Sequence, residues 1–204
     1  MSPFGVLALG FVIGAVAWYL LITTEGVYLG RRVVIWLYDV YARRYDRIKQ
    51  FDPAWESERL GVPLLLAHHG PKGPRVLDVA TGTARLPLAL LAESAFRGQI
   101  VGLDLSRKML GVAAEKLAAL DPAFATPVML VHQAAEHLPF PDATFDLVTC
   151  LEALEFTAQP AQTLAELVRV AKPGATILLS NRKGAGARLM PGRTWSGRAF
   201  KAAL

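Results

Sequence analysis

Two aspartates, each at the end of an apolar run, are the residues of this 204-residue sequence best placed to bind a small molecule. Asp78 is followed by the small residues of Val79-Ala80-Thr81-Gly82-Thr83-Ala84, and Asp104 ends the next apolar run. Small residues allow the backbone to approach a ligand closely, and a helix that begins after them points its N-terminus at the same place. A carboxylate at Asp104 can accept hydrogen bonds from both hydroxyls of a ribose. The pattern therefore predicts a nucleoside-binding site.

The charge of Asp78 narrows the choice of ligand. A dinucleotide would bring its anionic pyrophosphate to the turn after Asp78, where the two negative charges would repel each other. Gly82 is the only glycine of this turn, so the GxGxxG pattern of dinucleotide-binding proteins is absent, as is the GxxxxGK[ST] pattern of P-loop nucleotidases. S-adenosylmethionine (SAM) carries a positive ammonium and a positive sulfonium, and it therefore suits Asp78 better.

These residues lie in a stretch that alternates short apolar runs with helical patterns. The runs predict strands over residues 75–80, 99–105, 127–132, 145–151 and 175–180, and the patterns between them predict helices over 85–96, 106–120 and 162–171. Ser106 is expected to cap the second helix, which Asp121-Pro122 would end, and Lys172-Pro173-Gly174 would stop the third. This order predicts an α/β fold, a Rossmann-like doubly wound parallel sheet that binds its ligand at the carboxyl ends of the strands.

The N-terminal segment has a different character, because residues 4–22 contain no charged side chain. As a helix this segment would extend roughly 28 Å, close to the thickness of the hydrocarbon layer of a membrane. No Lys or Arg precedes it, so we interpret it as a retained single-pass anchor rather than a cleaved signal peptide, with a buried core helix as a third interpretation. Gly10 and Gly14 form a GxxxG pair that could seat a homodimer.

Basic residues cluster behind the apolar segment and at the other end of the chain. Residues 31–49 carry six basic and two acidic side chains, and residues 182–204 carry six basic and no acidic ones. By the positive-inside rule this distribution places the domain on the cytoplasmic side of the cell membrane. It favours anionic lipid as a partner over nucleic acid, which the net charge of +5 alone would suggest. We expect residues 26–50 to form a helix at the membrane surface.

Four ordered segments resemble the motifs of class I SAM-dependent methyltransferases: VLDVATGTARLPLAL, VGLDLSRKML, QAAEHLPFPDATFDLVTCLEALEF and LAELVRVAKPGATILLS. The resemblance covers residues 38–182, and YARRYDRI makes it nearest to the methyltransferases of ubiquinone and menaquinone biosynthesis. It implies SAM as the cofactor and transfer of a methyl group to a small or lipid-like acceptor. It also divides the chain into an anchor (1–25), basic and aromatic helices with a lid (26–70), a SAM-binding domain (71–182) and a basic tail (183–204).

The resemblance also implies which residues bind the cofactor: Asp78, Ala80, Thr81, Gly82, Asp104, Leu105, Met109, Gln133, Ala135 and Cys150. Asp78 would hold the methionine ammonium and Asp104 the ribose, while Cys150 and Leu151 would lie near the methionyl part. The adenine would lie between the residues that follow the second and third strands. Tyr45 would close over the site, whereas packing on the domain is the alternative for each of Tyr38, Tyr41 and Tyr45.

Two departures from the family pattern bear on activity. Ala134 stands where members of the family often have an acid that binds the adenine amino group. The family fold continues after the fifth strand with two more strands, but residues 183–204 show no strand pattern, so we expect a sheet without its last two strands. A catalytically degenerate binding or scaffold protein is therefore the alternative function, and an aminopropyl transferase is a third.

Positioning alone can supply much of the catalysis of methyl transfer, so a dedicated catalytic residue is not required. Glu152 and Glu155 follow the fourth strand and are candidates for a general base, with solvated or helix-capping carboxylates as the alternative. The single cysteine and the four histidines have no metal-ligand spacing, so we predict no metal site. The sequence does not identify the acceptor or the atom that is methylated.

Overall fold

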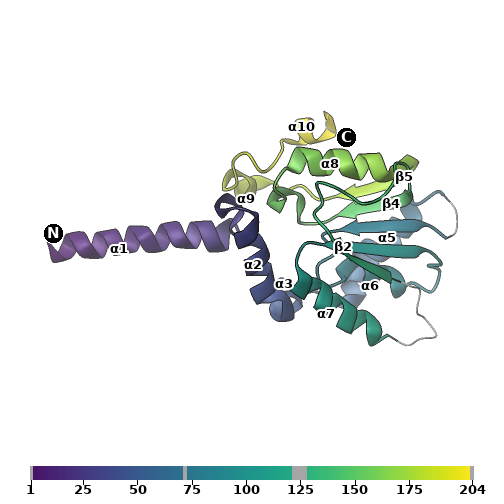
Figure 1. The fold of residues 1–204 in the computed structure, drawn as a ribbon, viewed down its shortest axis with the longest axis horizontal. Helices are drawn as coiled ribbons and strands as arrows, with labels where there is room; N and C mark the ends of the chain where they lie inside the picture. Colours follow the sequence, from purple (N-terminus) through teal and green to yellow (C-terminus); the bar gives the residue numbers. More distant parts are fainter. Residues whose placement is uncertain (1, 71–72, 121–127, 203–204) are drawn as a thin grey trace.

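The computed structural model describes residues 2–70, 73–120 and 128–202, and its centre is one parallel sheet flanked by helices (Figure 1). The five strands are β1 (Arg75–Val79), β2 (Gln99–Asp104), β3 (Val128–His132), β4 (Phe145–Cys150) and β5 (Ala171–Leu179). They lie in the order β3-β2-β1-β4-β5, and every neighbouring pair is parallel. The predicted Rossmann-like fold is confirmed, and its strand order reverses between β1 and β4. Pro127, the expected start of the third strand, lies outside the described residues.

Two hydrophobic cores hold helices on opposite faces of the sheet. One core joins helices α5 (Val62–Ala67) and α6 (Arg85–Leu91) to the sheet through Leu64, Leu86, Leu90, Val76, Ile100 and Leu147. The other joins α8 (Pro160–Val170) to the sheet through Leu167, Val170, Leu77, Val79, Leu103 and Val148. Because successive strand residues point to opposite faces, adjacent residues such as Val76 and Leu77 belong to different cores.

The helix after β2 begins as predicted, whereas the strand after α8 does not. Helix α7 (Arg107–Ala118) is capped by Ser106, whose Oγ accepts the N–H of Met109 at 3.1 Å. The predicted end of this helix at Asp121-Pro122 lies outside the described residues. Lys172-Pro173-Gly174, which we expected to stop the preceding helix, follows the end of α8 at Val170 but lies within β5 and not before it. A register shift against β4 accommodates these residues, and Gly174 takes the left-handed φ of +79° that the irregularity requires.

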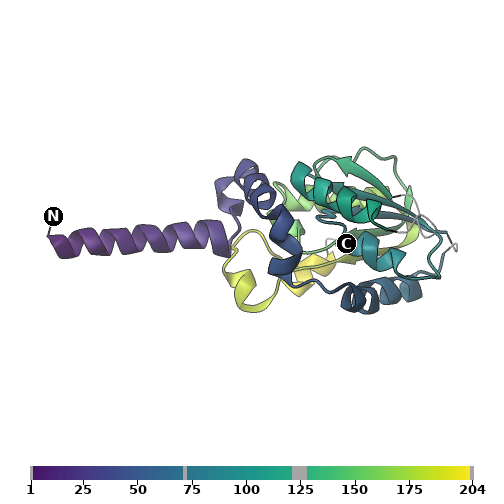
Figure 2. The ribbon, with the colours of Figure 1, turned by 90° about the horizontal axis from the view of Figure 1, so that it is seen from below.

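Helix α1 (Pro3–Trp18) and the π-helical turn η1 (Tyr19–Thr23) project away from the domain as one rod (Figures 1 and 2). The 21-residue segment Pro3–Thr23 has a mean hydropathy of 2.3, and none of its most apolar stretch is buried. By length and composition it could cross a membrane, as a signal sequence also could. Its exposure rules out the interpretation as a buried core helix.

The chain turns sharply at the foot of this rod. Glu25 and Gly26 both have a left-handed φ, of 49° and 74°. A Cβ at Gly26 would come within 2.8 Å of the Val33 side chain, so this turn requires glycine. A short 3₁₀ turn, Val27–Leu29, then leads into helix α2 (Arg31–Tyr41), which Figure 1 shows running across the end of α1.

Helices α2 and α3 (Tyr45–Lys49), joined by the 3₁₀ turn Ala42–Arg44, form what we call the cap, residues 31–49. The prediction of one continuous helix over residues 26–50 is therefore wrong, because the segment is bent and the cap packs on the domain, whereas its position at a membrane surface stays a prediction. Leu37 and Ala42 are buried, and the Asp39 carboxylate accepts the hydroxyl of Ser106 at 2.5 Å. Helix α4 (Pro53–Glu56) and the π-helical turn Ser57–Gly61 continue from the cap to α5.

The described part of the C-terminal segment contains two short helices, α9 (Gly184–Arg188) and α10 (Gly197–Ala202), and no strand. The sheet therefore ends at β5 in the described residues, as we expected. Trp195 and Phe200 pack against the core on the α8 side of the sheet. The segment also contacts the foot of the rod, where Tyr19 Oη donates to the Leu189 carbonyl at 2.8 Å.

Candidate functional site

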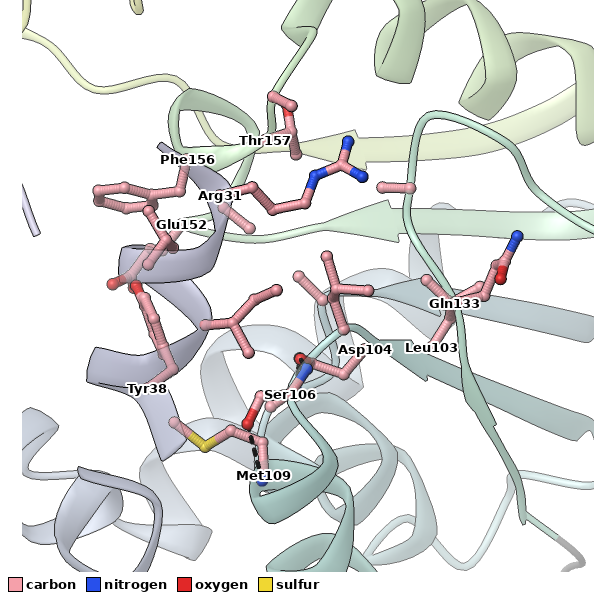
Figure 3. A pocket seen from close by; sticks show the side chains of 18 of the residues that line it. Arg31, Tyr38, Leu103, Asp104, Ser106, Met109, Gln133, Glu152, Phe156 and Thr157 are labelled. Carbon is pink, nitrogen blue, oxygen red and sulfur yellow. Dashed lines mark hydrogen bonds between the residues drawn. The ribbon is translucent and has the colours of Figure 1, made fainter. Parts of the chain in front are cut away.

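The carboxyl ends of the first four strands and the cap enclose one cavity (Figure 3). The residues of its lining that we predicted at the site are Tyr45, Ala80, Gly82, Asp104, Leu105, Met109, Gln133, Ala135, Leu151 and Glu152. A smaller cavity next to it is lined by Asp78, Thr81 and Arg85, among others. The two cavities share the lining residues Tyr45, Ala80, Gly82, Leu151 and Glu152. They are therefore two halves of one site, beside the point where the strand order reverses.

The turn after β1 lies between the two halves, and its small residues Ala80 and Gly82 line both of them. Ala80, Gly82 and Ala84 all have a left-handed φ, of 58°, 56° and 66°. Such values are unusual for alanine and store local strain, which the surrounding contacts must offset. The Thr81 N–H donates to the Leu103 carbonyl at 3.0 Å, and the Gly82 N–H donates to Asp104 Oδ2 at 2.9 Å. The turn is thus fixed to the end of β2.

Asp104 lies at the centre of the larger half, across the cavity from Tyr38 (Figure 3). Its Oδ1 accepts the Ser106 N–H at 2.8 Å, and its Oδ2 accepts the Gly82 N–H. Burial raises the pKa of this carboxyl group, and the backbone N–H donors oppose that rise. Each carboxylate oxygen has a second lone pair, so Asp104 can accept two further hydrogen bonds from a ligand in the cavity.

Asp78 lies in the smaller half and is only 3% exposed. The Thr149 hydroxyl donates to its Oδ1 at 2.7 Å. Burial raises the pKa of Asp78 to about 6, although the hydrogen bond from Thr149 opposes this change. Within the described part of the chain no basic side chain forms an ion pair with it. A buried carboxylate without a cation is costly, so a positively charged ligand group is the partner that this site favours.

A chain of ion pairs links the cap to the strand ends. Lys49 of α3 lies 3.2 Å from Glu152, which follows β4, and Glu152 lies 2.9 Å from Arg85 at the start of α6. Arg85 also lies 2.6 Å from Glu56 of α4. Burial alone would raise the pKa of Glu152, but the neighbouring Lys49 and Arg85 outweigh it and lower the pKa. Glu152 is therefore ionised at neutral pH.

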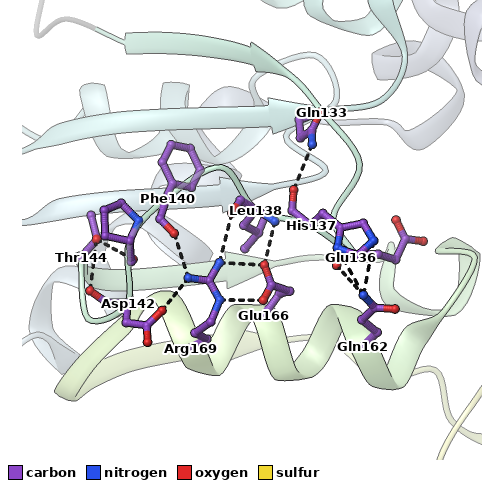
Figure 4. A network of polar contacts seen from close by, with 11 residues as sticks. Gln133, Glu136, His137, Leu138, Phe140, Asp142, Thr144, Gln162, Glu166 and Arg169 are labelled. Carbon is purple, nitrogen blue, oxygen red and sulfur yellow. Dashed lines mark hydrogen bonds and ion pairs between the residues drawn. The ribbon is translucent and has the colours of Figure 1, made fainter.

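The loop after β3 forms another wall of the larger half. Arg169 of α8 holds this loop through Glu166, Asp142 and the carbonyl oxygens of Leu138 and Phe140 (Figure 4). These contacts hold the backbone of the loop at Leu138, Phe140 and Asp142, and at Glu136 the same loop meets Arg31 of the cap. A loop held in this way can place a small side chain, such as Ala135, against a flat ligand in the larger half. No polar side chain is needed for that contact.

Residues 77–179 match a family model described as a methyltransferase domain. The chain belongs to this family. Its sequence is similar to the demethylmenaquinone methyltransferase of Symbiobacterium thermophilum, with 36% identity over 142 residues, which cover 70% of this chain and 56% of that protein. It is also similar to a ubiquinone/menaquinone biosynthesis C-methyltransferase of Cupriavidus pinatubonensis, with 40% identity over 107 residues, which cover 52% and 42% of the two chains. The chain spans about half the length of these curated relatives.

Solved methyltransferases share the fold. A methyltransferase from Bacillus halodurans superposes with a TM-score of 0.59 and 25% identity, covering 72% of this chain and 67% of its own. A SAM-dependent methyltransferase from Aquifex aeolicus gives a TM-score of 0.52 and 25% identity, covering 76% and 86%. The predicted resemblance to class I SAM-dependent methyltransferases is confirmed, and SAM is the cofactor that this family and fold imply.

The residues of this methyltransferase domain fit SAM. The buried Asp78 carboxylate suits the methionine ammonium, and the two accepting oxygens of Asp104 suit the ribose hydroxyls. Leu105, Met109 and Ala135 line the larger half with the apolar surface that an adenine ring requires. The smaller half, at the end of β1, thus suits the methionine end of SAM. The larger half, at and beyond the end of β2, suits its ribose and adenine.

Three residues that we predicted at the site have other contacts. Cys150 is fully buried in the core, where burial raises the pKa of its thiol, whereas Leu151, which we predicted beside it, lines both cavities. Glu155 is 4% exposed, pairs with Arg182 at 3.0 Å and lines neither half of the site. Gln133 lines the larger half, but its amide donates to the His137 carbonyl at 3.0 Å (Figure 4).

Sequence reasoning missed Arg31 and Glu136, which line the larger half together. They form an ion pair of 3.1 Å, and Glu136 also accepts the Ala158 N–H at 2.6 Å. Glu136 is thus the buried acid of this loop, two positions after Ala134, where we had looked for one. Sequence reasoning also missed Arg85, although its place directly after the glycine turn was a signal. Among the described residues no group of His, Cys, Asp and Glu could hold a metal ion.

Proposed function

We propose that this protein is a SAM-dependent methyltransferase that transfers a methyl group to a quinone-like acceptor at a membrane. The observation that carries the proposal is the pair of carboxylates at the ends of β1 and β2, of which Asp78 is buried with no ion-pair partner among the described residues and Asp104 lines the larger half. The names of the curated relatives, demethylmenaquinone and ubiquinone/menaquinone methyltransferases, support a quinone-like acceptor.

The residues of the chain would act mainly by binding and positioning. When bound, SAM supplies a methyl group on a sulfonium, and its transfer breaks the sulfur–carbon bond as the bond to the acceptor forms. Asp78 would hold the methionine end of the cofactor and Asp104 its ribose, while the rings of Tyr38 and Tyr45 exclude water from the larger half. Glu152 lines both halves and is placed to take the proton that the acceptor loses, although its lowered pKa makes it a weak base.

We further propose that the rod Pro3–Thr23 anchors the protein as a single-pass membrane helix, with the domain on the cytoplasmic side. The basic residues behind the rod support this orientation and a contact with anionic lipid. Gly10 and Gly14 are exposed on the rod, with nothing within 4 Å of an added Cβ, and would allow a homodimer. Alkaline carbonate extraction of membranes tests the anchor, because a peripheral protein would be released and an anchored one retained.

A catalytically inactive binding or scaffold protein is the second candidate. The sheet of the described residues ends at β5, and the chain spans about half the length of its curated relatives. Such a protein would bind SAM at the two aspartates without transferring its methyl group.

Methyl transfer by the full chain in phosphatidylcholine vesicles separates the two candidates. The vesicles would contain a naphthoquinol with an isoprenoid tail, and the SAM would carry a labelled methyl group. We expect the label to appear in the quinol. Labelled quinol at the level of a protein-free control, from a folded protein that binds SAM, would contradict the methyltransferase and favour the scaffold.

A further inference from the structure

A third cavity lies in the corner between the foot of the rod and the cap, outside the cofactor site. Its volume is about 370 Å³, which is within the range of small-molecule sites in proteins. Its lining is mostly apolar or aromatic and consists of Leu21, Ile22, Leu37, Tyr41, Ile48, Tyr38, Tyr45, Glu25 and Lys49. The cofactor does not account for this cavity, because the carboxylates that suit SAM lie at the strand ends.

Only two tyrosines belong to the lining of both this corner cavity and the larger half of the cofactor site. Tyr38 and Tyr45 stand side by side, with ring centroids 5.9 Å apart. The Tyr38 hydroxyl donates to Glu25 Oε2 at 2.7 Å, which fixes the ring at the inner end of the corner cavity. The Tyr38 and Tyr45 side chains therefore border both spaces.

The outer end of the corner cavity lies where the apolar rod ends. Leu21 and Ile22 belong to the last turn of the rod. On the cap, Trp36, Val40 and Ile48 leave 58%, 55% and 56% of their surfaces exposed. Large exposed apolar side chains next to a segment that could cross a membrane are typical of contact with the membrane interface. A molecule dissolved in the bilayer could thus enter the corner cavity without crossing water.

We propose that the corner cavity holds the apolar tail of a membrane-dissolved acceptor, whose ring reaches the cofactor site past the side chains of Tyr38 and Tyr45. This inference rests on the proposed methyltransferase function. The occupant would have a long apolar tail and a flat, oxygen-bearing ring. The tail would lie against Leu21, Ile22 and Ile48, which line the corner cavity.

A substitution that fills the corner cavity tests the tail site by comparing two acceptors. Ile48→Trp adds bulk at a half-exposed lining position, and Leu66→Trp is the matched control, because Leu66 of α5 is 73% exposed and remote from all three cavities. The full chain in phosphatidylcholine vesicles would be given an isoprenoid-tailed naphthoquinol or a water-soluble, tail-less one. We expect the ratio of kcat/KM for the tailed acceptor to that for the tail-less acceptor to fall about tenfold in Ile48→Trp and to stay constant in Leu66→Trp. An unchanged ratio in Ile48→Trp would overturn the proposal.

Photolabelling decides the same question without methyl transfer. A naphthoquinone with a diazirine on a long alkyl tail would be dissolved in the same vesicles and activated by light. We expect label within residues 21–25 and 37–48, and several-fold less of it in Ile48→Trp than in Leu66→Trp. Label confined to residues 4–18, or equal labelling of the two variants, would contradict the tail site. A wild-type chain that takes the label but methylates neither acceptor would contradict the proposed function while leaving the tail site supported.

Discussion

The two sides of the cofactor cavity differ in how their residues are held. On the strand side, the buried Asp78 and Asp104 carboxylates are held by Thr149 of the neighbouring strand and by the backbone N–H groups of Gly82 and Ser106. On the cap side, Tyr38 and Lys49 reach the site through contacts with residues distant in sequence. The strand side thus has a geometry set by the sheet, whereas the cap side depends on a few polar links that solvent can reach. We therefore expect residues of the strand side to determine the affinity for the cofactor, and residues of the cap side to determine the KM for the acceptor.

The largest effect that we expect on the strand side is a gain of stability on neutralising Asp78. Its pKa of about 6 in the folded protein lies above the ordinary value of 3.8, so folding takes up a proton between these values. The free energy of unfolding therefore falls as pH rises from about 4 to 6, by up to about 3 kcal/mol. Asp78→Asn removes this loss. Thermal unfolding of the cofactor-free chain in detergent should show a higher Tm for Asp78→Asn at pH 8 and nearly equal Tm values at pH 4.

A variant that is less stable than wild type at pH 8 would show that Asp78 already has a cation partner in the free protein. That result would contradict the proposed difference between the two sides, because Asp78 would then be neutralised without a positively charged ligand. Thr149→Val is the control, since it removes the hydrogen bond of Asp78 and leaves the charge. We expect it to lower the Tm at pH 8.

Asp104→Ala should weaken SAM binding by about 1–3 kcal/mol, because the ribose hydroxyls lose a charged acceptor. Isothermal titration of the full chain in detergent measures this loss directly. Glu115→Ala on the exposed face of α7 is a charge-matched control and should bind SAM as the wild type does. Equal affinity of Asp104→Ala and wild type would remove Asp104 from the site.

Breaking the cap link has a smaller expected effect. Lys49→Ala removes the ion pair with Glu152, whose partners are both partly exposed, so the pair contributes at most about 1 kcal/mol. We expect KM for the quinol acceptor to rise several-fold, with SAM affinity changed less than twofold. Steady-state methyl transfer at low and high salt measures KM for the quinol. Added salt should also raise this KM in the wild type, because salt screens the ion pair. A large loss of SAM affinity would show that the two sides are not separable.

The smallest effect that we expect is that of a methyl group at the turn. Gly82 has a φ of 56°, and an added Cβ would meet only the Tyr45 ring, at 3.9 Å. Gly82→Ala should therefore cost about 1 kcal/mol of backbone strain without a clash. Chemical denaturation checks this value, and a loss of several kcal/mol would show that the turn is more tightly enclosed than the structure indicates.

Much of the fold and of the strand side could be predicted, because its signals are local in the sequence. Apolar runs that end in Asp78 and Asp104, and a serine before a helix, specify strands, strand ends and a cap without knowledge of distant contacts. The helix of the rod could also be predicted, because residues 4–22 contain no charged side chain. Even the absence of a further strand in the described residues after β5 followed from the pattern of residues 183–204.

The rest depended on contacts that a sequence pattern does not contain. The bend of the cap follows from its packing on α7 through Asp39, 67 residues before Ser106 in the chain. Cys150 was assigned to the site because it ends β4, but the alternation of side chains turns it into the core and leaves Leu151 at the cavity. Arg31 and Glu136 meet only when the cap folds over the loop after β3.

The pH dependence of SAM binding tests most directly the claim that a buried carboxylate holds the cofactor's cation. Because Asp78 must be ionised, we expect the affinity of the wild type to be constant above about pH 7 and to fall about tenfold between pH 7 and pH 5. Asp78→Asn should bind SAM at least about thirtyfold more weakly at pH 7.5 and show a weaker dependence on pH. Wild-type affinity in Asp78→Asn, or no change in wild-type affinity through pH 6, would contradict this account of the site.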